Sequence, residues 1–203
     1  MRALQIAELG SIDNLYVGEA PSPKLGEGQV RVGVKAAGVN FPDILMSEGK
    51  YQVKPDLPFI PGLELAGEVL ECAQGVSHVK PGDRVMAFAR RGGAYAAEAV
   101  LSGGIVTPIP DDMDFVTAAA FPVAYGTAHF ALKHRGKLQA GETLLVLGAT
   151  GGVGIAAIEI GKLLGARVIA AASSAEKLEI AKAHGADDVV NYRDESLRDA
   201  VKA

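Results

Sequence analysis

The sequence predicts an α/β protein in which a β-rich, barrel-like domain precedes the first half of a doubly wound parallel sheet. Three observations lead to this fold class. Before about residue 120, short β-like runs are separated by Gly and Pro, whereas helix and strand patterns alternate after about residue 117. At residues 148–154, a glycine-rich turn joins an apolar run to a helix-like segment. We therefore expect two domains, at residues 1–120 and 121–203.

The first domain is expected to contain several short strands. Residues 29–36, QVRVGVKA, alternate apolar and polar side chains as a half-buried strand does. The N-terminal run MRALQIAELG also alternates, and residues 80–88 combine a Pro-Gly turn with a following strand. Further strands are expected within residues 63–72 and over residues 94–101.

The second domain is expected to alternate helices and strands. Apolar periodicity predicts helices over residues 117–136, 152–164 and 176–184, with Pro122 as a kink or start of the first, and strands over residues 143–147, 167–172 and 188–191. Residues 195–203 predict the start of another helix. Gly165 and Gly185 occupy positions where helix C-termini are expected.

This order of elements is one half of a doubly wound sheet, and a complete domain of that kind has a second half. We therefore expect the 203 residues to be a truncated part of a longer protein. The alternative is a naturally short form in which a partner covers the open edge of the sheet.

Composition excludes several function classes. The net charge is −4 and no block of Lys and Arg occurs, so we expect no nucleic-acid partner. Cys72 is the only cysteine, which excludes an internal disulfide framework and a cysteine-rich zinc lobe. No apolar run approaches the roughly 20 residues that span a bilayer, and the N-terminus lacks the apolar segment of a signal peptide. We expect a cytoplasmic protein with no membrane association.

The glycine turn carries the strongest functional signal. Gly148, Gly151 and Gly154 form a G-x-x-G-x-x-G pattern with an additional Gly152, between a predicted strand and a predicted helix. Bare amide N–H groups and the positive end of the helix dipole would face the pyrophosphate of a dinucleotide. We predict a nicotinamide dinucleotide site here; the alternative is a tight strand-to-helix turn without a ligand.

The residues after the second strand of this domain favour NADPH over NADH. An NAD site usually carries Asp or Glu at this position, whereas this chain has Ser173, Ser174 and Lys177. Hydroxyl and ammonium groups suit a 2′-phosphate. Ser173-x-x-Glu176 is also a capping-box pattern, and both roles can hold at once. Tyr192 either lines the adenosine end of the cofactor or is an ordinary half-exposed strand residue.

Four stretches in order match a known family: GVNFPD at residues 38–43, PGLELAG at 61–67, PGDRV at 81–85 and GATGGVG at 148–154. On these stretches the chain resembles the medium-chain dehydrogenase/reductase superfamily, and most of all its zinc-free quinone oxidoreductase (zeta-crystallin-like) branch. The resemblance implies a GroES-like catalytic domain at residues 1–120 and the N-terminal portion of a Rossmann NADPH-binding domain at residues 121–203. Asn40 and Leu63 stand where zinc alcohol dehydrogenases have Cys and His ligands, which implies that no zinc is bound.

The resemblance also implies roles for individual residues. The pyrophosphate would contact Thr150, Gly151, Gly152 and Val153, the 2′-phosphate region would contact Ser173, Lys177 and Tyr192, and the nicotinamide would lie near Asn40, Phe41, Asp43 and Thr127. Asn40 and Tyr51 are the implied catalytic residues. Tyr51 matches a tyrosine that binds cofactor in quinone reductases and donates a proton in related enoyl-thioester reductases. Its other interpretation is an aromatic residue that packs the lip of the cleft.

Together these inferences predict an NADPH-dependent oxidoreductase that transfers hydride to a quinone or an α,β-unsaturated carbonyl without zinc. Such acceptors delocalise the negative charge that hydride addition creates, so they need no Lewis acid. The alternatives are an enoyl-thioester (acyl-CoA) reductase of the same fold and a non-catalytic nucleotide-binding module. We expect a homodimer when the protein is full length, and weak or absent turnover by the 203-residue chain alone.

Overall fold

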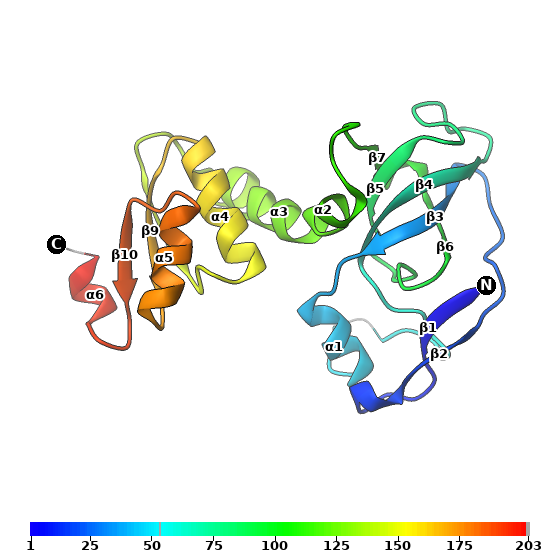
Figure 1. Cartoon of the computed structure of the whole chain (residues 1–203), viewed down its shortest axis with the longest axis horizontal. Coiled ribbons are helices and arrows are strands. Elements are labelled where there is room, and N and C mark those ends of the chain that lie inside the picture. The colour runs from blue at the N-terminus through cyan, green and yellow to red at the C-terminus, as the bar shows by residue number, and fades with distance from the viewer. Residues whose placement is uncertain (53, 202–203) are drawn as a thin grey trace. The chain divides into compact units, whose positions relative to one another are not determined.

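A computed structural model describes residues 1–52 and 54–201 of the chain. These residues form two compact units, Met1–Val123 and Ala124–Ala203, which are coloured blue to green and green to red in Figure 1. No helix in the described ranges is long and apolar enough to cross a membrane.

The first unit is built on an antiparallel sheet of five strands in the order β6-β3-β4-β5-β7 (Figure 1). These strands are β3 (Gln29–Ala37), β4 (Glu64–Cys72), β5 (Arg84–Phe88), β6 (Glu98–Ser102) and β7 (Val106–Pro108). A separate hairpin pairs β1 (Arg2–Ile6) with β2 (Leu15–Glu19), and two short helices, α1 (Phe41–Ser47) and α2 (Phe115–Ala119), complete the unit. The expected β-rich first part of the chain is therefore confirmed.

Both faces of the central strand β4 are covered, which explains its nearly continuous burial. Leu65 and Val69 point into one core together with Val30 and Val32 of β3. Ala66 points to the other face, where α2 packs against it. Burial of successive residues on opposite faces requires a second layer over the sheet, because side chains alternate along a strand.

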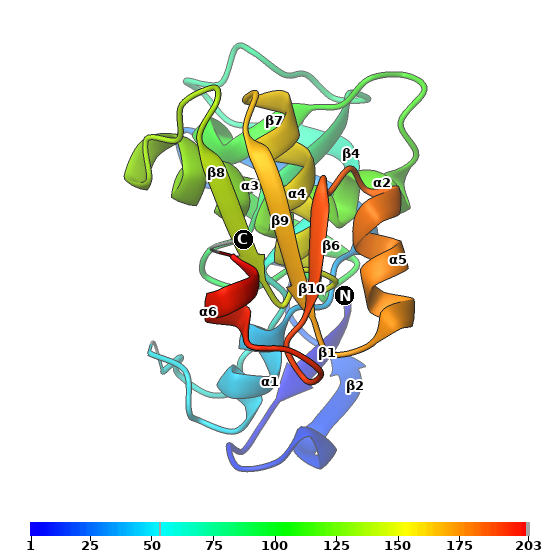
Figure 2. The same cartoon turned by 90° about the vertical axis from the view of Figure 1, so that its left-hand side faces the viewer.

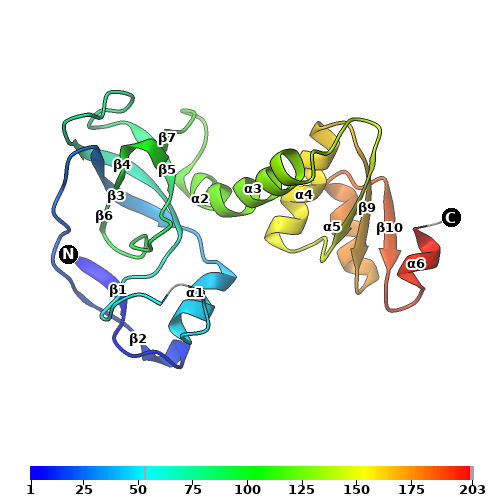
Figure 3. The same ribbon diagram turned by 180° about the vertical axis from the view of Figure 1, so that it is seen from behind.

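The second unit is a parallel three-stranded sheet in the order β10-β9-β8, seen face-on in Figure 2. After α3 (Phe121–His129) and a π-helical segment, Phe130–Arg135, its elements in chain order are β8 (Thr143–Leu147), α4 (Gly152–Leu163), β9 (Arg167–Ala172), α5 (Ala175–Ala183), β10 (Asp188–Asn191) and α6 (Leu197–Ala200). Val168 and Ala170 of β9 pack under α4 and α5. Ile169 and Ala171 face the opposite side, where α6 lies (Figure 3). This arrangement confirms the predicted first half of a doubly wound sheet.

Two glycines end the helices of this unit as the sequence predicts. Gly165 and Gly185 have φ values of 83° and 102°. At each end, the glycine N–H and the next residue's N–H bond back to carbonyls of the last helical turn, from Gly165 to Lys162 and from Ala166 to Gly161 after α4. This is the Schellman arrangement, in which a left-handed residue satisfies carbonyl groups that the helix leaves unpaired.

The helix expected over residues 117–136 is divided in the structure, so that prediction is wrong in its extent. The segment contains α2, then α3 (Phe121–His129), then a π-helical segment, Phe130–Arg135. Pro122 lacks an N–H and cannot continue the hydrogen bonding of α2, so it marks the start of α3 as expected. Asp114 caps α2 by accepting hydrogen bonds from the Val116 and Thr117 amides, each at 2.8 Å.

Other local expectations differ from the structure by a few residues. The strand expected over residues 94–101 begins at Glu98, and β2, β7 and α1 were not predicted. The helix expected over residues 195–203 is α6, and residues 202 and 203 lie outside the described residues. The Ser173-x-x-Glu176 capping box is wrong, because Ser174 is the N-cap of α5 and its Oγ accepts from the Lys177 amide at 3.4 Å. The helix begins at Ala175, one residue before the range expected from the sequence.

Asp187 generates a testable pH dependence of stability. Its carboxylate accepts two hydrogen bonds from Lys162 Nζ, at 2.6 and 2.7 Å, and one from the Val168 amide at 2.7 Å. The bond from Lys162, followed by that from Val168, lowers the pKa of Asp187 below its ordinary value of 3.8. Because the pKa is depressed on folding, this stabilisation is present above the ordinary pKa and is lost as the pH falls through the folded-state pKa.

We expect Asp187→Asn to lower the free energy of unfolding at neutral pH by about 0.5–1 kcal/mol, the discounted value for exposed charged partners. The difference from wild type should shrink as the pH is lowered below about 3.8. Urea unfolding followed by circular dichroism at several pH values measures both effects. Asp188→Asn, which removes a surface ion pair with Arg167, is the control. A difference from wild type that does not change with pH would contradict the assignment.

Candidate functional site

The glycine turn at residues 148–154 leaves open N–H groups at the start of α4. Gly148 has a φ of 60° and turns the chain away from β8. Gly151 is the N-cap of α4, and no side chain caps this helix end. The first-turn amides of Gly152 and Val153 therefore have no acceptor among the described residues. Such amides, aligned with the positive end of a helix dipole, form an anion-binding site.

The glycines of this turn have two different reasons to be glycine. A Cβ on Gly154 would lie 2.8 Å from the carbonyl carbon of Ala149 and closer still to Gly148 O, so the fold itself requires glycine there. On Gly151 the nearest atom to an added Cβ would be 3.5 Å away, and on Gly152 it would be 3.9 Å away. Both residues are exposed beside a hollow of about 490 Å³. The space left at Gly152 is thus available to a ligand.

The predicted 2′-phosphate residues lie at the same edge of the sheet as this turn. The Ala149 amide bonds Ala171 O at 3.3 Å, and the Tyr192 amide bonds Ala172 O at 3.2 Å, which joins the carboxyl ends of the three strands. Ser173 makes no side-chain hydrogen bond within the described ranges, and Lys177 is exposed with no ion pair there. Tyr192 is 46% exposed.

Arg193 is a cation at this edge that sequence reasoning missed. It follows Tyr192, is exposed, and makes no ion pair within the part of the chain that the structure describes. The two carboxylates that follow it already accept bonds from Asn191: Asp194 from Asn191 Nδ2, and Glu195 from the Asn191 amide at 3.3 Å. A guanidinium two residues after the end of β10 is the sequence signal that would have identified it.

Thr150 and Thr127 complete the predicted residues of this unit. Thr150 belongs to the turn between β8 and α4 and is half-buried. Thr127 is exposed on α3, three residues after Ala124, whose Cβ is the closest atom to the space at Gly152. Residues three apart on a helix share a face, so Thr127 lies on the face of α3 that meets the turn.

In the first unit, Asn40 and Asp43 join a buried polar network at the start of α1. Asp43 is 5% exposed, and its carboxylate accepts hydrogen bonds from the Asn40 amide at 2.8 Å, the Gly62 amide at 3.2 Å and the Tyr95 hydroxyl at 2.8 Å. Glu64 is 3% exposed and accepts from Asn40 Nδ2 at 2.8 Å and from the Val123 amide at 2.7 Å. Charge-assisted bonds of this kind compensate for the burial of two carboxylates that form no ion pair within the described residues.

Two motif glycines provide the space for this network. A Cβ on Gly38 would lie 2.7 Å from Glu64 Cδ, and a Cβ on Gly62 would lie 2.6 Å from the ring of Tyr95. Gly62 also has a φ of 97°, which disfavours other residues. The glycines at these two positions therefore make room for side chains of the chain itself, which distinguishes them from Gly151 and Gly152.

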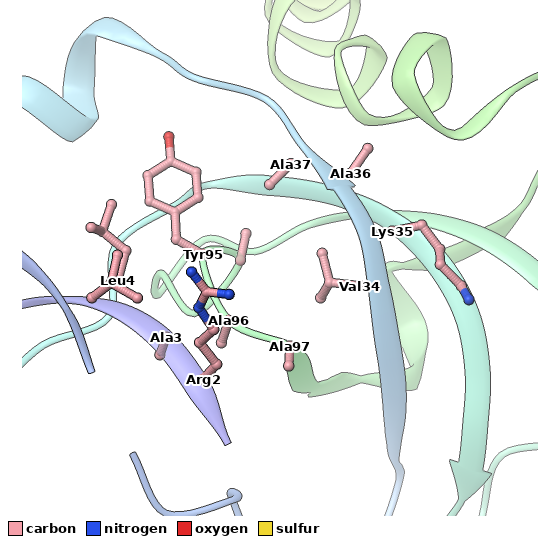
Figure 4. Close-up of a pocket in the computed structure, with 12 residues that line it drawn as sticks. Arg2, Ala3, Leu4, Val34, Lys35, Ala36, Ala37, Tyr95, Ala96 and Ala97 are labelled. Carbon is pink, nitrogen blue, oxygen red and sulfur yellow. The ribbon is translucent and has the colours of Figure 1, made fainter. Parts of the chain in front are cut away.

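Tyr95 and Glu64 are the network residues whose roles the sequence did not reveal. Figure 4 shows the Tyr95 ring in a hollow of about 350 Å³ beside β1 and β3, with its hydroxyl turned away from the Arg2 guanidinium. Burial, and then the hydrogen bond to Asp43, raises the pKa of Tyr95 well above its ordinary value of 10.0. The phenol thus stays protonated as a donor to Asp43 at neutral pH. Its only sequence signal is its place after the turn glycines of GGAY.

Tyr51 and Phe41 lie outside this network. Phe41 is the first residue of α1 and is 70% exposed. Tyr51 lines a hollow of about 510 Å³, and its hydroxyl makes no hydrogen bond with the described residues. The other residues that line this hollow are Met46, Pro55, Asp56, Phe59, Arg90 and Arg91. The structure thus groups Asn40 with Asp43, and it places Tyr51 in a cavity of its own.

Comparisons with known proteins place this geometry in a family. Residues 26–111 match the alcohol dehydrogenase GroES-like domain, and residues 152–203 match the zinc-binding dehydrogenase family. The quinone oxidoreductase-like protein 2 homolog of Nematostella vectensis is 43% identical over 203 residues, which cover 99% of this chain and 55% of that protein. The chain belongs to the medium-chain dehydrogenase/reductase superfamily.

Solved structures of other proteins are also similar to this medium-chain dehydrogenase/reductase. A mycobacterial protein solved in complex with NADPH is 33% identical with a TM-score of 0.88, and the match covers 100% of this chain and 62% of that one. The CurK enoyl reductase is 30% identical with a TM-score of 0.87, and the match covers 95% and 60% of the two chains. The chain spans about 55–62% of the length of these relatives.

Asn40 and Leu63 occupy the two positions of this medium-chain dehydrogenase/reductase at which zinc alcohol dehydrogenases carry metal ligands. Asn40 Nδ2 already donates to Glu64, and Leu63 is buried and carries no donor atom in its side chain. Within residues 1–52 and 54–201, no group of three His, Cys, Asp or Glu residues is arranged to hold a metal ion.

We expect Tyr95→Phe to lower the free energy of unfolding by about 1–2 kcal/mol, because the buried Asp43 carboxylate loses a hydrogen-bond donor. Urea unfolding at neutral pH measures the effect. Tyr16→Phe is the matched control, since Tyr16 is 42% exposed and its hydroxyl forms no hydrogen bond with the described residues. Equal stability of the two variants would show that the Tyr95 hydroxyl does not support the network.

Proposed function

We propose that the chain carries the cofactor-binding and catalytic elements of an NADPH-dependent oxidoreductase that reduces a quinone or an α,β-unsaturated carbonyl without zinc. In this proposal residues 1–120 are the catalytic domain and residues 121–203 are the N-terminal portion of the NADPH-binding domain. The observation that carries the proposal is the uncapped start of α4, where Gly151 and Gly152 leave space and open amides. At the same sheet edge lie Ser173, Lys177 and Tyr192, whose side chains have no partner among the described residues.

The residues at this edge fit the phosphates of NADPH. Thr150, Gly151, Gly152 and Val153 would hold the pyrophosphate through the turn and the first amides of α4. Ser173, Lys177 and Tyr192 would bind the 2′-phosphate, and we add Arg193 to this set. Because β9 ends in Ala172 and is followed by two serines, no carboxylate stands there to repel a phosphate. The mycobacterial relative solved with NADPH supports the same cofactor.

NADPH, when bound, supplies the hydride. The chain's own residues then bind and orient the acceptor and manage the proton. Asn40 presents an amide whose orientation is fixed by Glu64, and the Tyr51 phenol can donate its proton to the oxygen of an enolate or phenolate. Asn40, Phe41, Asp43 and Thr127 as neighbours of the nicotinamide remain predictions. The homodimer and the cytoplasmic location also remain predictions.

The proposed reaction does not use zinc, because Asn40 and Leu63 stand where the resembled zinc alcohol dehydrogenases have Cys and His ligands. Neither an amide nor an isobutyl group replaces a thiolate or an imidazole as a zinc ligand. A quinone or an enone accepts hydride and delocalises the resulting charge over its conjugated system. The reaction therefore needs a proton donor more than it needs a Lewis acid.

An enoyl-thioester reductase is the second candidate. The chain is 30% identical to the CurK enoyl reductase, which supports this activity as well. An enoyl thioester is itself an α,β-unsaturated carbonyl, so the two candidates share the hydride step and differ in the group attached to the acceptor. Binding of NADPH without turnover of any acceptor would instead favour a nucleotide-binding module.

We expect Gly152→Val to weaken NADPH binding to the chain by at least about tenfold, because the side chain fills the space next to open amides. In the whole protein it should abolish NADPH consumption with naphthoquinone. Isothermal titration calorimetry and the loss of NADPH absorbance measure the two effects. Gly104→Val, at an open glycine of the first unit, is the control.

The stability of these variants separates binding from folding. Gly152→Val should unfold close to the wild-type urea concentration, since the nearest described atom to an added Cβ is Ala124 Cβ at 3.9 Å. Gly154→Ala should instead lose about 1–3 kcal/mol, the usual range for overpacking. Wild-type NADPH affinity in Gly152→Val would refute the pyrophosphate assignment.

We expect Lys177→Gln to weaken NADPH binding by about tenfold and to leave NADH binding unchanged, because only NADPH carries the 2′-phosphate. Calorimetric titration of each nucleotide measures the ratio. Lys182→Gln is the matched control on the same helix, since Lys182 pairs with Glu179 at 2.9 Å. Equal losses for the two nucleotides would contradict a 2′-phosphate contact.

A further inference from the structure

The turn between β5 and β6 presents two arginines from a fixed backbone. Gly92 and Gly93, with φ values of 81° and 99°, follow Arg90 and Arg91 directly. The Gly92 amide bonds Ala89 O and the Gly93 amide bonds Ile60 O, both at 2.8 Å. A Cβ on Gly92 would lie 2.7 Å from Ile60 O, so the turn packs against the segment of the same chain that contains Ile60. The two arginines thus project from an anchored turn.

Neither arginine side chain makes an ion pair or a hydrogen bond within the described residues. Both are exposed and take part in no ion pair there. Arg31, in contrast, pairs with Glu71 and Glu98, and Arg84 donates to the carbonyls of Pro110 and Asp111. Unpaired guanidinium groups on a fixed turn are available to bind an oxyanion without prior rearrangement.

These arginines share a hollow with apolar groups and one phenol. The hollow of about 510 Å³ has the size of a small-molecule site. Met46, Pro55 and Phe59 supply apolar walls for a planar group, and Tyr51 supplies a hydroxyl. Asp56 is the only carboxylate among the lining residues, so the two guanidinium groups leave a net positive charge. Arg91 also borders two neighbouring hollows of about 300 and 360 Å³.

We propose that this hollow binds a planar, conjugated acceptor that carries an anionic group. Arg90 and Arg91 bind the oxyanion, Phe59 and Met46 contact the conjugated plane, and Tyr51 donates to its carbonyl oxygen. The proposal rests on the proposed function and narrows its substrate class from quinones and enones in general to acidic ones. The anionic group can be a substituent of a quinone or enone, or a phosphate of an acyl-CoA thioester, since a guanidinium binds either.

Direct binding to the chain tests the anion site without turnover. Calorimetry compares naphthoquinone sulfonate with unsubstituted naphthoquinone. We expect the double substitution Arg90→Gln with Arg91→Gln to weaken binding of the sulfonate by about tenfold and to leave binding of the neutral quinone unchanged. Raising the NaCl concentration from about 0.05 M to about 0.5 M should weaken only sulfonate binding to the wild type.

Two further variants sharpen this test. Asp56→Asn should strengthen sulfonate binding, because it removes the one carboxylate from the hollow. Arg2→Gln removes an exposed arginine that lines a different hollow and should change nothing. Equal binding of the sulfonate by wild type and the double variant would overturn the proposal, as would weaker sulfonate binding by Asp56→Asn.

Turnover by the whole protein shows whether the anionic group belongs to a quinone or to a CoA thioester. It also separates the anion site from the proposed function. The acceptors are naphthoquinone sulfonate, naphthoquinone, crotonyl-CoA and S-crotonyl-N-acetylcysteamine, which is a thioester without phosphates. Each anionic acceptor is compared with its neutral counterpart. If the double variant loses about tenfold in kcat/KM for one anionic acceptor and not for its neutral counterpart, the anion site is supported and that acceptor is the source of the anionic group. NADPH consumption that is unaffected by the arginines refutes this inference and leaves the proposed function standing. No NADPH consumption with any acceptor, with arginine-dependent sulfonate binding retained, refutes the proposed function and leaves the anion site standing.

Discussion

The close contact between Gly154 and the backbone at Gly148 and Ala149 is the constraint on which the second unit depends. No side chain separates the first turn of α4 from the end of β8, because an added Cβ would lie 2.8 Å from the Ala149 carbonyl carbon. This contact holds the helix N-terminus directly above the strand end. The open amides of Gly152 and Val153 then face outward, beside the ends of β9 and β10, as a consequence of packing. The same backbone contact therefore shapes the core of the unit and leaves these amides open.

The first unit meets a different physical demand, the burial of two carboxylates. Asp43 and Glu64 are nearly inaccessible, and within the described residues their oxygens are satisfied by amides, one phenol and the Asn40 side chain. Since Glu64 accepts from Asn40 Nδ2, the orientation of the Asn40 amide is set by a group that solvent does not reach. Buried charges that are fully hydrogen-bonded fix the geometry of their partners more firmly than neutral groups would. Asn40 is thus held in one orientation at the start of α1.

Local sequence patterns were enough to predict the second unit. The buried network around Asn40 could not be predicted, because it depends on contacts between residues far apart in the sequence. The turn glycines, the three strands and the helix-ending Gly165 and Gly185 each carry their signal within a few residues. The helix expected over residues 117–136 was wrong because apolar periodicity continues across Pro122 although the hydrogen bonding does not. Tyr95 and Asp43 are 52 residues apart, and Glu64 and Asn40 are 24 apart, so no spacing rule brings them together. The first half of the sheet and the position of the glycine turn between β8 and α4 could be predicted, whereas the buried network around Asn40 could not.

The two Schellman turns have a consequence for how the protein can change over evolution. Gly165 and Gly185 return the chain to the amino edge of the sheet, where the helix ends are satisfied by backbone bonds. The opposite edge carries Ser173, Lys177 and Tyr192, which lie outside the apolar core. Substitutions at that edge leave the helix endings and the core untouched. A lineage could therefore alter the charge and the hydrogen-bonding groups of this edge through neutral drift at a few surface positions, without passing through a poorly folded intermediate.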